Sequence, residues 1–116
     1  MSMWKGQRIE AIEVTEAQAG SEHNVLLDVR EADEWEAGHA PGAAWIPLGD
    51  LERARMEIPF NKSIVCVCRS GARSARAAEE LISWGFEAAN MTGGMRAWAA
   101  AGLPVVRDDE TPGVVI

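Results

Sequence analysis

Cysteine is scarce in this sequence, and no apolar run approaches the length of a membrane-spanning helix. The 116 residues contain two cysteines, Cys66 and Cys68. A membrane span needs about 20 mostly apolar residues in a row. The N-terminus also lacks the apolar core and small-residue cleavage site of a secretion signal. We therefore expect a cytoplasmic protein with no membrane partner.

The two cysteines are separated by one residue within a segment that is predicted to be extended. Their side chains then share one face of a strand, and joining them would give a strained ring. We expect no disulfide between them, in keeping with a reducing compartment.

Basic residues are outnumbered, with 11 Lys and Arg against 18 Asp and Glu, which gives a net charge of −7. Nucleic-acid binding depends on neutralising phosphates with Lys and Arg, so we predict no nucleic-acid partner. Four basic residues nevertheless lie near Cys68 in the sequence: Lys62, Arg69, Arg73 and Arg76. This spacing predicts a local positive potential there.

Metal and nucleotide signatures are also missing. No His and Cys grouping has metal-ligand spacing, and no glycine-rich fingerprint follows the first predicted strand. We therefore predict no metal and no cofactor. His39, within "GHAPGA", is better explained as a turn residue that holds backbone groups than as a general base.

Short β-rich runs alternate with helical runs over one expected domain, residues 1–116, without repeats or linkers. We expect strands over 8–14, 24–29, 63–68 and 86–91 and a short extended piece before Pro47, with helices that begin at Thr15 or cover 31–38, 49–58, 74–84 and 95–101. This alternation predicts an α/β fold with a mainly parallel sheet and helices on both faces.

Glycines mark the expected helix ends. Gly38, Gly85 and Gly102 follow predicted helices and favour the left-handed cap conformation. Helix 74–84 is expected to bury one face, made of Ala75, Ala78, Leu81 and Ile82. The polar C-terminal tail, residues 107–116, is expected to be loosely held.

Cys68 closes the strand 63–68 and precedes "RSGAR" and a helix. Open parallel sheets bind ligands beyond the carboxyl ends of their strands. Free backbone N–H groups and a helix start favour an anion there and lower the pKa of a thiol. The pattern therefore predicts a nucleophilic Cys68. Cys66, inside the strand, is predicted to pack in the core, with a role as a redox partner as the alternative.

Other residues at this edge have two interpretations. Asp28 and Arg30 end the second core strand, where Arg30 could add positive potential or the pair could fix nearby backbone by hydrogen bonds; we favour the second. Gly93 and Gly94 are expected to permit a tight approach beside the site. Trp98, in "GGMRAW" with Arg96, is expected to be a core anchor.

Three separated motifs carry a family resemblance: "LLDVREADEWEAGHAPGA", "IVCVCRSGARS" and "MTGGMRAWAAAGLPV". In this order and spacing, over about residues 8–106, the chain resembles the rhodanese-like domain family. The resemblance implies a five-stranded parallel sheet and a six-residue loop opened by the active-site cysteine. By position, Cys68 resembles the persulfide-forming nucleophile, with loop amides around the sulfur from Arg69, Ser70, Gly71, Ala72 and Arg73. We assign supporting roles to Asp28, Arg30 and Ser74.

The resemblance also implies an activity: transfer of a sulfane sulfur from a donor such as thiosulfate to cyanide or a thiol, through a persulfide on Cys68. The partners would be a small sulfur-containing anion or persulfide donor and a small or protein acceptor. Ser70 stands where the two-domain thiosulfate enzyme has lysine, which leaves the physiological donor open. Related phosphatases have five residues between cysteine and arginine, whereas four separate Cys68 from Arg73.

Two other functions remain open at this point. The chain could be a non-catalytic or partner-dependent module that docks or relays sulfur. Phosphate hydrolysis or arsenate reduction would use the same anion-binding logic, but the shorter loop suits a sulfur atom better.

Overall fold

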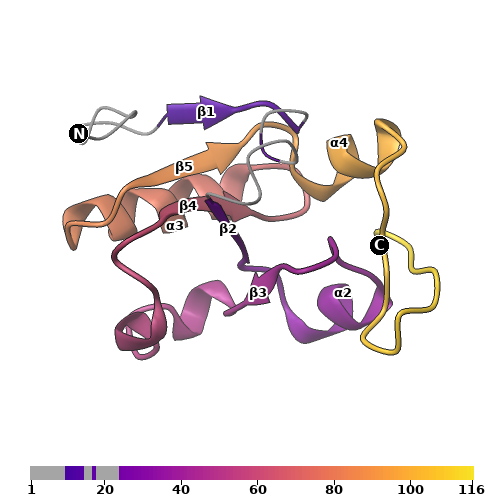
Figure 1. Ribbon diagram of the computed structural model, residues 1–116, viewed down its shortest axis with the longest axis horizontal. Helices are drawn as coiled ribbons and strands as arrows, with labels where there is room; N and C mark the ends of the chain where they lie inside the picture. Colours follow the sequence, from indigo (N-terminus) through magenta and orange to yellow (C-terminus); the bar gives the residue numbers. More distant parts are fainter. Residues whose placement is uncertain (1–9, 15–16, 18–23) are drawn as a thin grey trace.

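The computed structural model describes residues 10–14, 17 and 24–116, which are built around a five-stranded parallel sheet (Figure 1). The strand order is β1-β5-β4-β2-β3, and every pairing is parallel. The strands are β1 (Glu10–Ile12), β2 (Asn24–Asp28), β3 (Ala44–Trp45), β4 (Ser63–Val67) and β5 (Ala88–Met91). The predicted α/β class and parallel sheet are confirmed.

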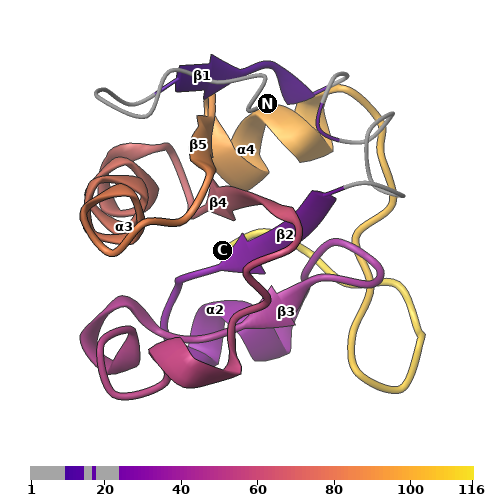
Figure 2. The same cartoon turned by 60° about the vertical axis from the view of Figure 1, so that its left-hand side comes forward.

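Helices lie on both faces of the sheet, as predicted. The helices are α2 (Ala32–Ala37), α3 (Ala72–Ser83) and α4 (Gly94–Ala100). Figure 2 shows α3 on one side of β4 and β5 and α4 on the other. Neighbouring residues of β2 take opposite sides: Leu26 joins the core cluster that contains Trp98 of α4, and Leu27 joins the one that contains Leu81 of α3.

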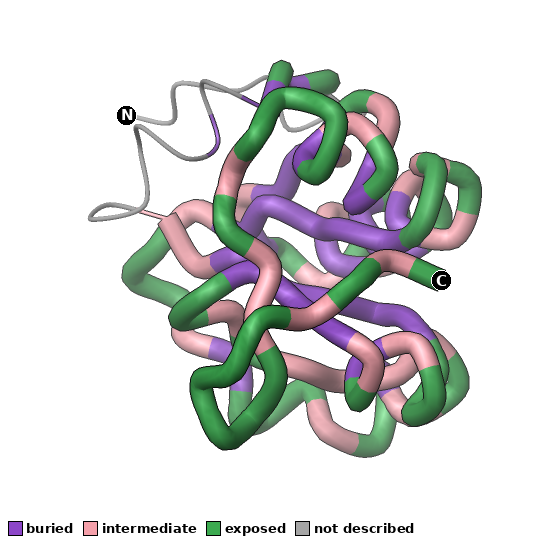
Figure 3. The backbone as a smooth tube through the Cα atoms, turned by 90° about the vertical axis from the view of Figure 1, so that its right-hand side faces the viewer, coloured by how far each residue is buried: buried purple, intermediate pink, exposed green. Residues whose placement is uncertain are grey.

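The central strands β2 and β4 are therefore buried on both faces, which explains their continuous apolar sequence. Figure 3 shows the buried segments gathered in the interior of the molecule, and the buried residues include Leu26, Leu27, Ile64 and Val65 of these two strands. Within the described ranges, no helix is both long and apolar enough to span a bilayer.

The predicted helix over 49–58 is wrong. The chain instead forms two short 3₁₀ turns, η1 (Leu48–Asp50) and η2 (Arg55–Glu57). Only Leu51 and Ile58 are buried in this stretch, so an α-helix would lack the continuous apolar face that stabilises short helices. The helix predicted to begin at Thr15 falls mostly outside the described residues.

The predicted left-handed conformation is found at two of the three helix-end glycines. Gly85 and Gly102 follow α3 and α4 with φ of 94° and 79°, which confirms the left-handed conformation. Gly38 ends α2 but is extended, with φ of 164°, so the predicted left-handed cap is wrong there. Its lack of a side chain serves packing instead, because a Cβ at Gly38 would lie 2.7 Å from the backbone of Val114.

That contact comes from the tail 107–116, which is not loosely held. The N–H of Val114 donates to the carbonyl of Ala37 at 2.9 Å, and the N–H of Gly113 donates to the carbonyl of Val105 at 2.9 Å. The tail thus packs back along the end of α2.

The buried face of α3 is rotated from the predicted one. Its buried residues are Ser74, Ala77, Ala78 and Leu81, whereas Ala75 and Ile82 are half-buried. This rotation turns the Ser74 hydroxyl toward the sheet.

Asp28 and Arg30 form a buried ion pair at the end of β2. The Nε of Arg30 donates to Oδ1 of Asp28 at 2.9 Å, and Nη2 donates to Oδ2 at 2.8 Å. Nη2 also donates to the carbonyl of Gly38 at 2.8 Å. The pair fixes the end of α2 against the end of β2, which supports the structural interpretation.

We expect Asp28→Asn to lower the free energy of unfolding by about 3–5 kcal/mol, because it leaves the buried guanidinium of Arg30 without its charge partner. Asp50→Asn is the control, since Asp50 pairs with Arg53 at the surface and its removal costs at most about 1 kcal/mol. Urea unfolding of both variants measures the difference. Equal losses would mean that the buried pair is not a structural tie.

Candidate active site

Cys68 lies directly after β4, at the carboxyl edge of the sheet. The short loop Arg69–Gly71 follows it, and α3 begins at Ala72. Asp28, which pairs with Val67 in the sheet, ends β2 at the same edge. The predicted placement of Cys68 at this edge is confirmed. Cys68 is 1% exposed.

Hydrogen-bond donors converge on the Cys68 sulfur. The N–H of Gly71 lies 3.1 Å from Sγ, and the Ser74 hydroxyl lies 3.2 Å from it. Gly71 has φ of 118°, a conformation that favours glycine. Burial acts to raise the pKa of Cys68, but the Ser74 hydroxyl and the N–H groups of Ser74, Gly71 and Ser70 outweigh it and hold the pKa below its ordinary value. This is the direction that the sequence predicts.

The first residues of α4 bind backbone carbonyls at the start of the loop. The N–H groups of Met95 and Arg96 donate to the carbonyls of Cys68 and Arg69, at 2.8 Å and 3.0 Å. The approach is so close that a Cβ at Gly94 would lie 2.4 Å from the Cys68 oxygen. With these carbonyls turned to α4, the N–H groups of the same two peptide groups, those of Arg69 and Ser70, face away from α4, and the Ser70 N–H is one of the donors that lower the pKa of Cys68. The expected tight approach at Gly94 is confirmed.

Arg73 does not extend freely into the site. Its Nη1 and Nη2 donate to Oε1 and Oε2 of Glu34 at 2.7 Å and 2.8 Å, which joins α3 to α2. The hydrogen bond from Arg73 holds the pKa of Glu34 below its usual value, and the same bond raises the pKa of Arg73. The sequence analysis missed Glu34, although an acidic predicted helix beside a basic loop was a signal for such a pair.

The predicted cluster of four basic residues is not formed. Lys62 precedes β4 and Cys68 follows it, so about 20 Å of extended chain separates them. Arg76 is exposed, and its Nε lies 3.8 Å from Oε2 of Glu80. The remaining member, Arg69, is exposed and donates from Nε to the Ile116 carbonyl at 2.9 Å. The sequence analysis overestimated the positive charge near Cys68, because the two ends of a strand lie at opposite edges of the sheet.

Ser70 and Ala72 are exposed at the mouth of the loop, whereas Ser74 is completely buried. Asn90 of β5 completes the site and was missed by the sequence analysis. Its Oδ1 accepts from the Ser74 hydroxyl at 2.5 Å, and its Nδ2 donates to the Gly71 carbonyl at 3.2 Å. A polar residue inside the apolar run 86–91 was the available signal.

Three residues that were predicted to be structural have structural contacts. Cys66 is completely buried among apolar side chains, and this burial, with a smaller effect of Cys68, raises the pKa of its thiol. Nδ1 of His39 donates to the Trp35 carbonyl at 2.9 Å, and the two rings stack with centroids 3.5 Å apart. Trp98 is buried and donates to the Pro104 carbonyl at 2.7 Å.

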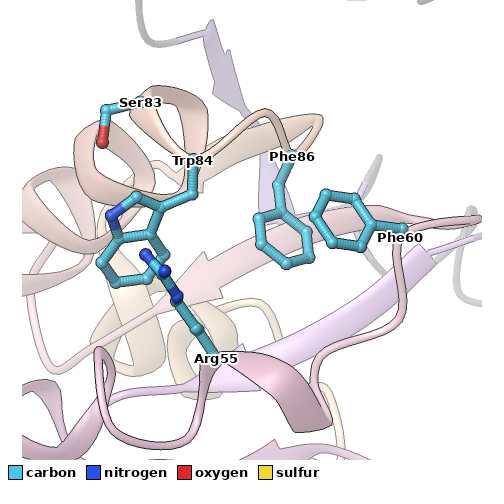
Figure 4. Close-up of a pocket in the computed structure, with 5 residues that line it drawn as sticks. All are labelled: Arg55, Phe60, Ser83, Trp84 and Phe86. Atoms are coloured by element: carbon cyan, nitrogen blue, oxygen red, sulfur yellow. The ribbon is translucent and has the colours of Figure 1, made fainter.

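A hollow with a volume of about 350 Å³ lies at the edge of the sheet opposite to Cys68. Arg55, Phe60, Ser83, Trp84 and Phe86 line it (Figure 4). Phe60 stacks on Phe86, and Arg55 lies over the Trp84 ring. The Ser83 hydroxyl donates to the Glu80 carbonyl at 2.7 Å. Among the described residues, no group of three or more His, Cys, Asp or Glu is placed to hold a metal.

We expect Gly94→Ala to slow alkylation of Cys68 at pH 7 by about tenfold, because the added Cβ displaces the loop and weakens the hydrogen bonds that favour the thiolate. Gly49→Ala is the control, since a Cβ there meets nothing within 4 Å. Iodoacetamide rates, with circular dichroism as a check of folding, measure the effect. A folded Gly94→Ala protein with the normal rate would contradict the proposed loop docking.

Comparisons with known proteins agree with this geometry. The family model of the rhodanese-like domain matches residues 11–101. The chain is 35% identical to a sulfurtransferase of Allochromatium vinosum over 99 residues, which are 84% of this chain and 92% of that protein. It is 43% identical over 74 residues, or 63% of its length, to the putative sulfur carrier protein YrkF of Bacillus subtilis, of which it spans only 40%.

The fold agrees as well. A crystal structure of a rhodanese-related protein from Thermoplasma volcanium superposes with a TM-score of 0.80 at 29% identity, covering 84% of this chain and 97% of that one. With a family model that matches most of the chain, the conclusion is direct: this chain belongs to the rhodanese-like domain family.

Proposed function

We propose that this protein is a sulfurtransferase that carries a sulfane sulfur as a persulfide on Cys68. One observation carries the proposal: at the carboxyl edge of the sheet, the Cys68 sulfur accepts hydrogen bonds from the Gly71 N–H and the Ser74 hydroxyl. Relatives named as sulfurtransferases and as a sulfur carrier support a role in sulfur transfer at the level of the family.

The first half-reaction is a displacement at sulfur. The Cys68 thiolate attacks the outer sulfur of a donor such as thiosulfate and forms a new S–S bond. The S–S bond of the donor breaks, and its electron pair leaves with sulfite. The terminal sulfur now attached to Cys68 carries the negative charge, which the loop N–H groups of Ser70 and Gly71 and the start of α3 favour.

The second half-reaction returns the enzyme to its starting state. Cyanide or a thiolate attacks the terminal sulfur, and the Cys68 thiolate leaves with the electron pair of the broken S–S bond. The products are thiocyanate or a new persulfide, and a thiol acceptor loses its proton to solvent when it ionises. Neither half-reaction needs a general base at the attacking atom, because the nucleophile is already an anion.

The acceptor has to reach a sulfur that is almost fully buried. Cys68 is 1% exposed, whereas Arg69 and Ser70 beside it are exposed. A small thiol or an extended side chain of a partner protein suits such an opening. The similarity to a putative sulfur carrier favours partner-dependent relay as the second candidate function.

The test is the intact mass of the reduced protein after brief exposure to thiosulfate. We expect the wild type and Cys66→Ser to gain one sulfur atom, which cyanide then removes, because Cys66 is a buried, poorly ionised thiol. Cys68→Ser should gain none.

Mass gain by Cys68→Ser would place the persulfide elsewhere and contradict the proposal. Wild-type protein that gains sulfur only from a persulfidated protein donor, and not from thiosulfate, would favour the relay function.

We expect Arg73→Ala to lower the rate of sulfur transfer by about tenfold, less than the loss of about a hundredfold or more for a donor that touches the reacting group. The reason is that Arg73 favours the Cys68 thiolate from a distance and ties α3 to α2 through Glu34. Arg76→Ala, an exposed arginine on the same helix, should retain the normal rate. Thiocyanate formation from thiosulfate and cyanide measures both; equal rates would remove Arg73 from the site.

A further inference from the structure

Asn90 reaches the active-site loop from the neighbouring strand β5. Its Nδ2 lies 3.2 Å from the Gly71 carbonyl, and its Oδ1 lies 2.5 Å from the Ser74 hydroxyl oxygen. A carbonyl oxygen only accepts hydrogen bonds, so the amide nitrogen must face Gly71. The amide oxygen of Asn90 is therefore held toward Ser74.

The Ser74 hydroxyl has one proton and three acceptors within reach. These are Oδ1 of Asn90 at 2.5 Å, Sγ of Cys68 at 3.2 Å and the Gly71 carbonyl at 3.3 Å. Ser74 is completely buried, so bulk water does not substitute for any of them. The shortest contact is to Asn90, which competes with the sulfur for the proton.

We propose that Asn90 is a positioning residue that sets the reactivity of Cys68 by competing for the hydroxyl proton of Ser74. The hydroxyl donates to Asn90 while Cys68 is a neutral thiol and turns to the sulfur when Cys68 ionises. The inference rests on Cys68 as the nucleophile of the proposed function, but it does not depend on the identity of the sulfur donor or acceptor.

The competition has a definite sign. Turning the hydroxyl to the sulfur breaks the contact with Asn90, so Asn90 opposes ionisation and keeps the pKa of Cys68 from falling further. A thiolate of very low pKa is a weaker nucleophile, and the best attacking thiol has a pKa near the ambient pH. Asn90 thus balances the amount of thiolate against its nucleophilicity.

Charged and titratable groups near Cys68 do not account for this effect. From α3, Arg73 acts on Cys68 and is itself paired with Glu34 of α2; from β4, Cys66 is a neutral neighbour. The side-chain hydrogen bonds of Ser74 and Asn90 involve none of these three groups. Arg73 and Glu34 are unchanged in every variant below, and all the variants share the same Cys66→Ser background.

The experiment is the pH profile of Cys68 alkylation by iodoacetamide in a Cys66→Ser background. Asn90→Leu keeps the size of the side chain but removes the competing oxygen, so we expect the midpoint to fall by about one pH unit. Asn90→Asp places a carboxylate at the same acceptor position, and we expect the midpoint to rise.

Ser74→Ala distinguishes competition from a change of loop shape. With Ser74 removed, adding Asn90→Leu should no longer shift the midpoint, because no proton remains to compete for. A rise with Asn90→Leu, or an equal fall with and without Ser74, would overturn the proposal. If Asn90→Leu does not fold, Asn90→Asp decides, since its rise must be larger with Ser74 than without it.

This assay separates the two proposals. Alkylation needs no sulfur donor, so the expected pH shifts together with an absence of sulfur transfer would contradict the proposed function and leave the role of Asn90 intact. Sulfur transfer through Cys68 with unchanged midpoints would do the reverse.

Discussion

The docking of the loop Arg69–Gly71 onto α4 is the contact on which the rest of the candidate site depends. Two N–H groups at the start of α4 bind the carbonyls of Cys68 and Arg69, and the missing side chain of Gly94 makes this approach possible. A peptide group whose carbonyl is held on one side presents its N–H on the other. The two peptide groups held in this way therefore present the N–H groups of Arg69 and Ser70 on the side away from α4, and the Ser70 N–H helps to lower the pKa of Cys68.

This arrangement separates two cysteines that the sequence makes look alike. Cys66 and Cys68 lie two residues apart, and both belong to the core cluster on the α3 side of the sheet. Burial raises the pKa of Cys66, whereas hydrogen bonds at Cys68 overcome the same effect and lower its pKa. The difference arises because the strand ends at Val67, so that only Cys68 adjoins free N–H groups.

Two arginines near the site, Arg73 and Arg30, are each paired with a carboxylate. Glu34 of α2 binds Arg73 of α3, and Asp28 and Arg30 bind each other at the end of β2. The site thus combines ion-paired side chains with backbone N–H donors, whose dipoles are fixed by the fold. Such fixed dipoles suit the anionic sulfur of the proposed persulfide.

The sequence by itself determined the alternation of strands and helices, the parallel sheet and the position of Cys68 at a strand end, because these follow from local apolar periodicity and from glycine placement. Only the tertiary structure decided the 3₁₀ turns over 48–57, the extended Gly38 beneath the tail and the distance of Lys62 from the site. It also decided that Ser74 and Asn90 meet at the sulfur. Residues on α3 and β5 become neighbours only when the helix packs on the sheet, and a hydrogen bond between them leaves no local pattern along the chain.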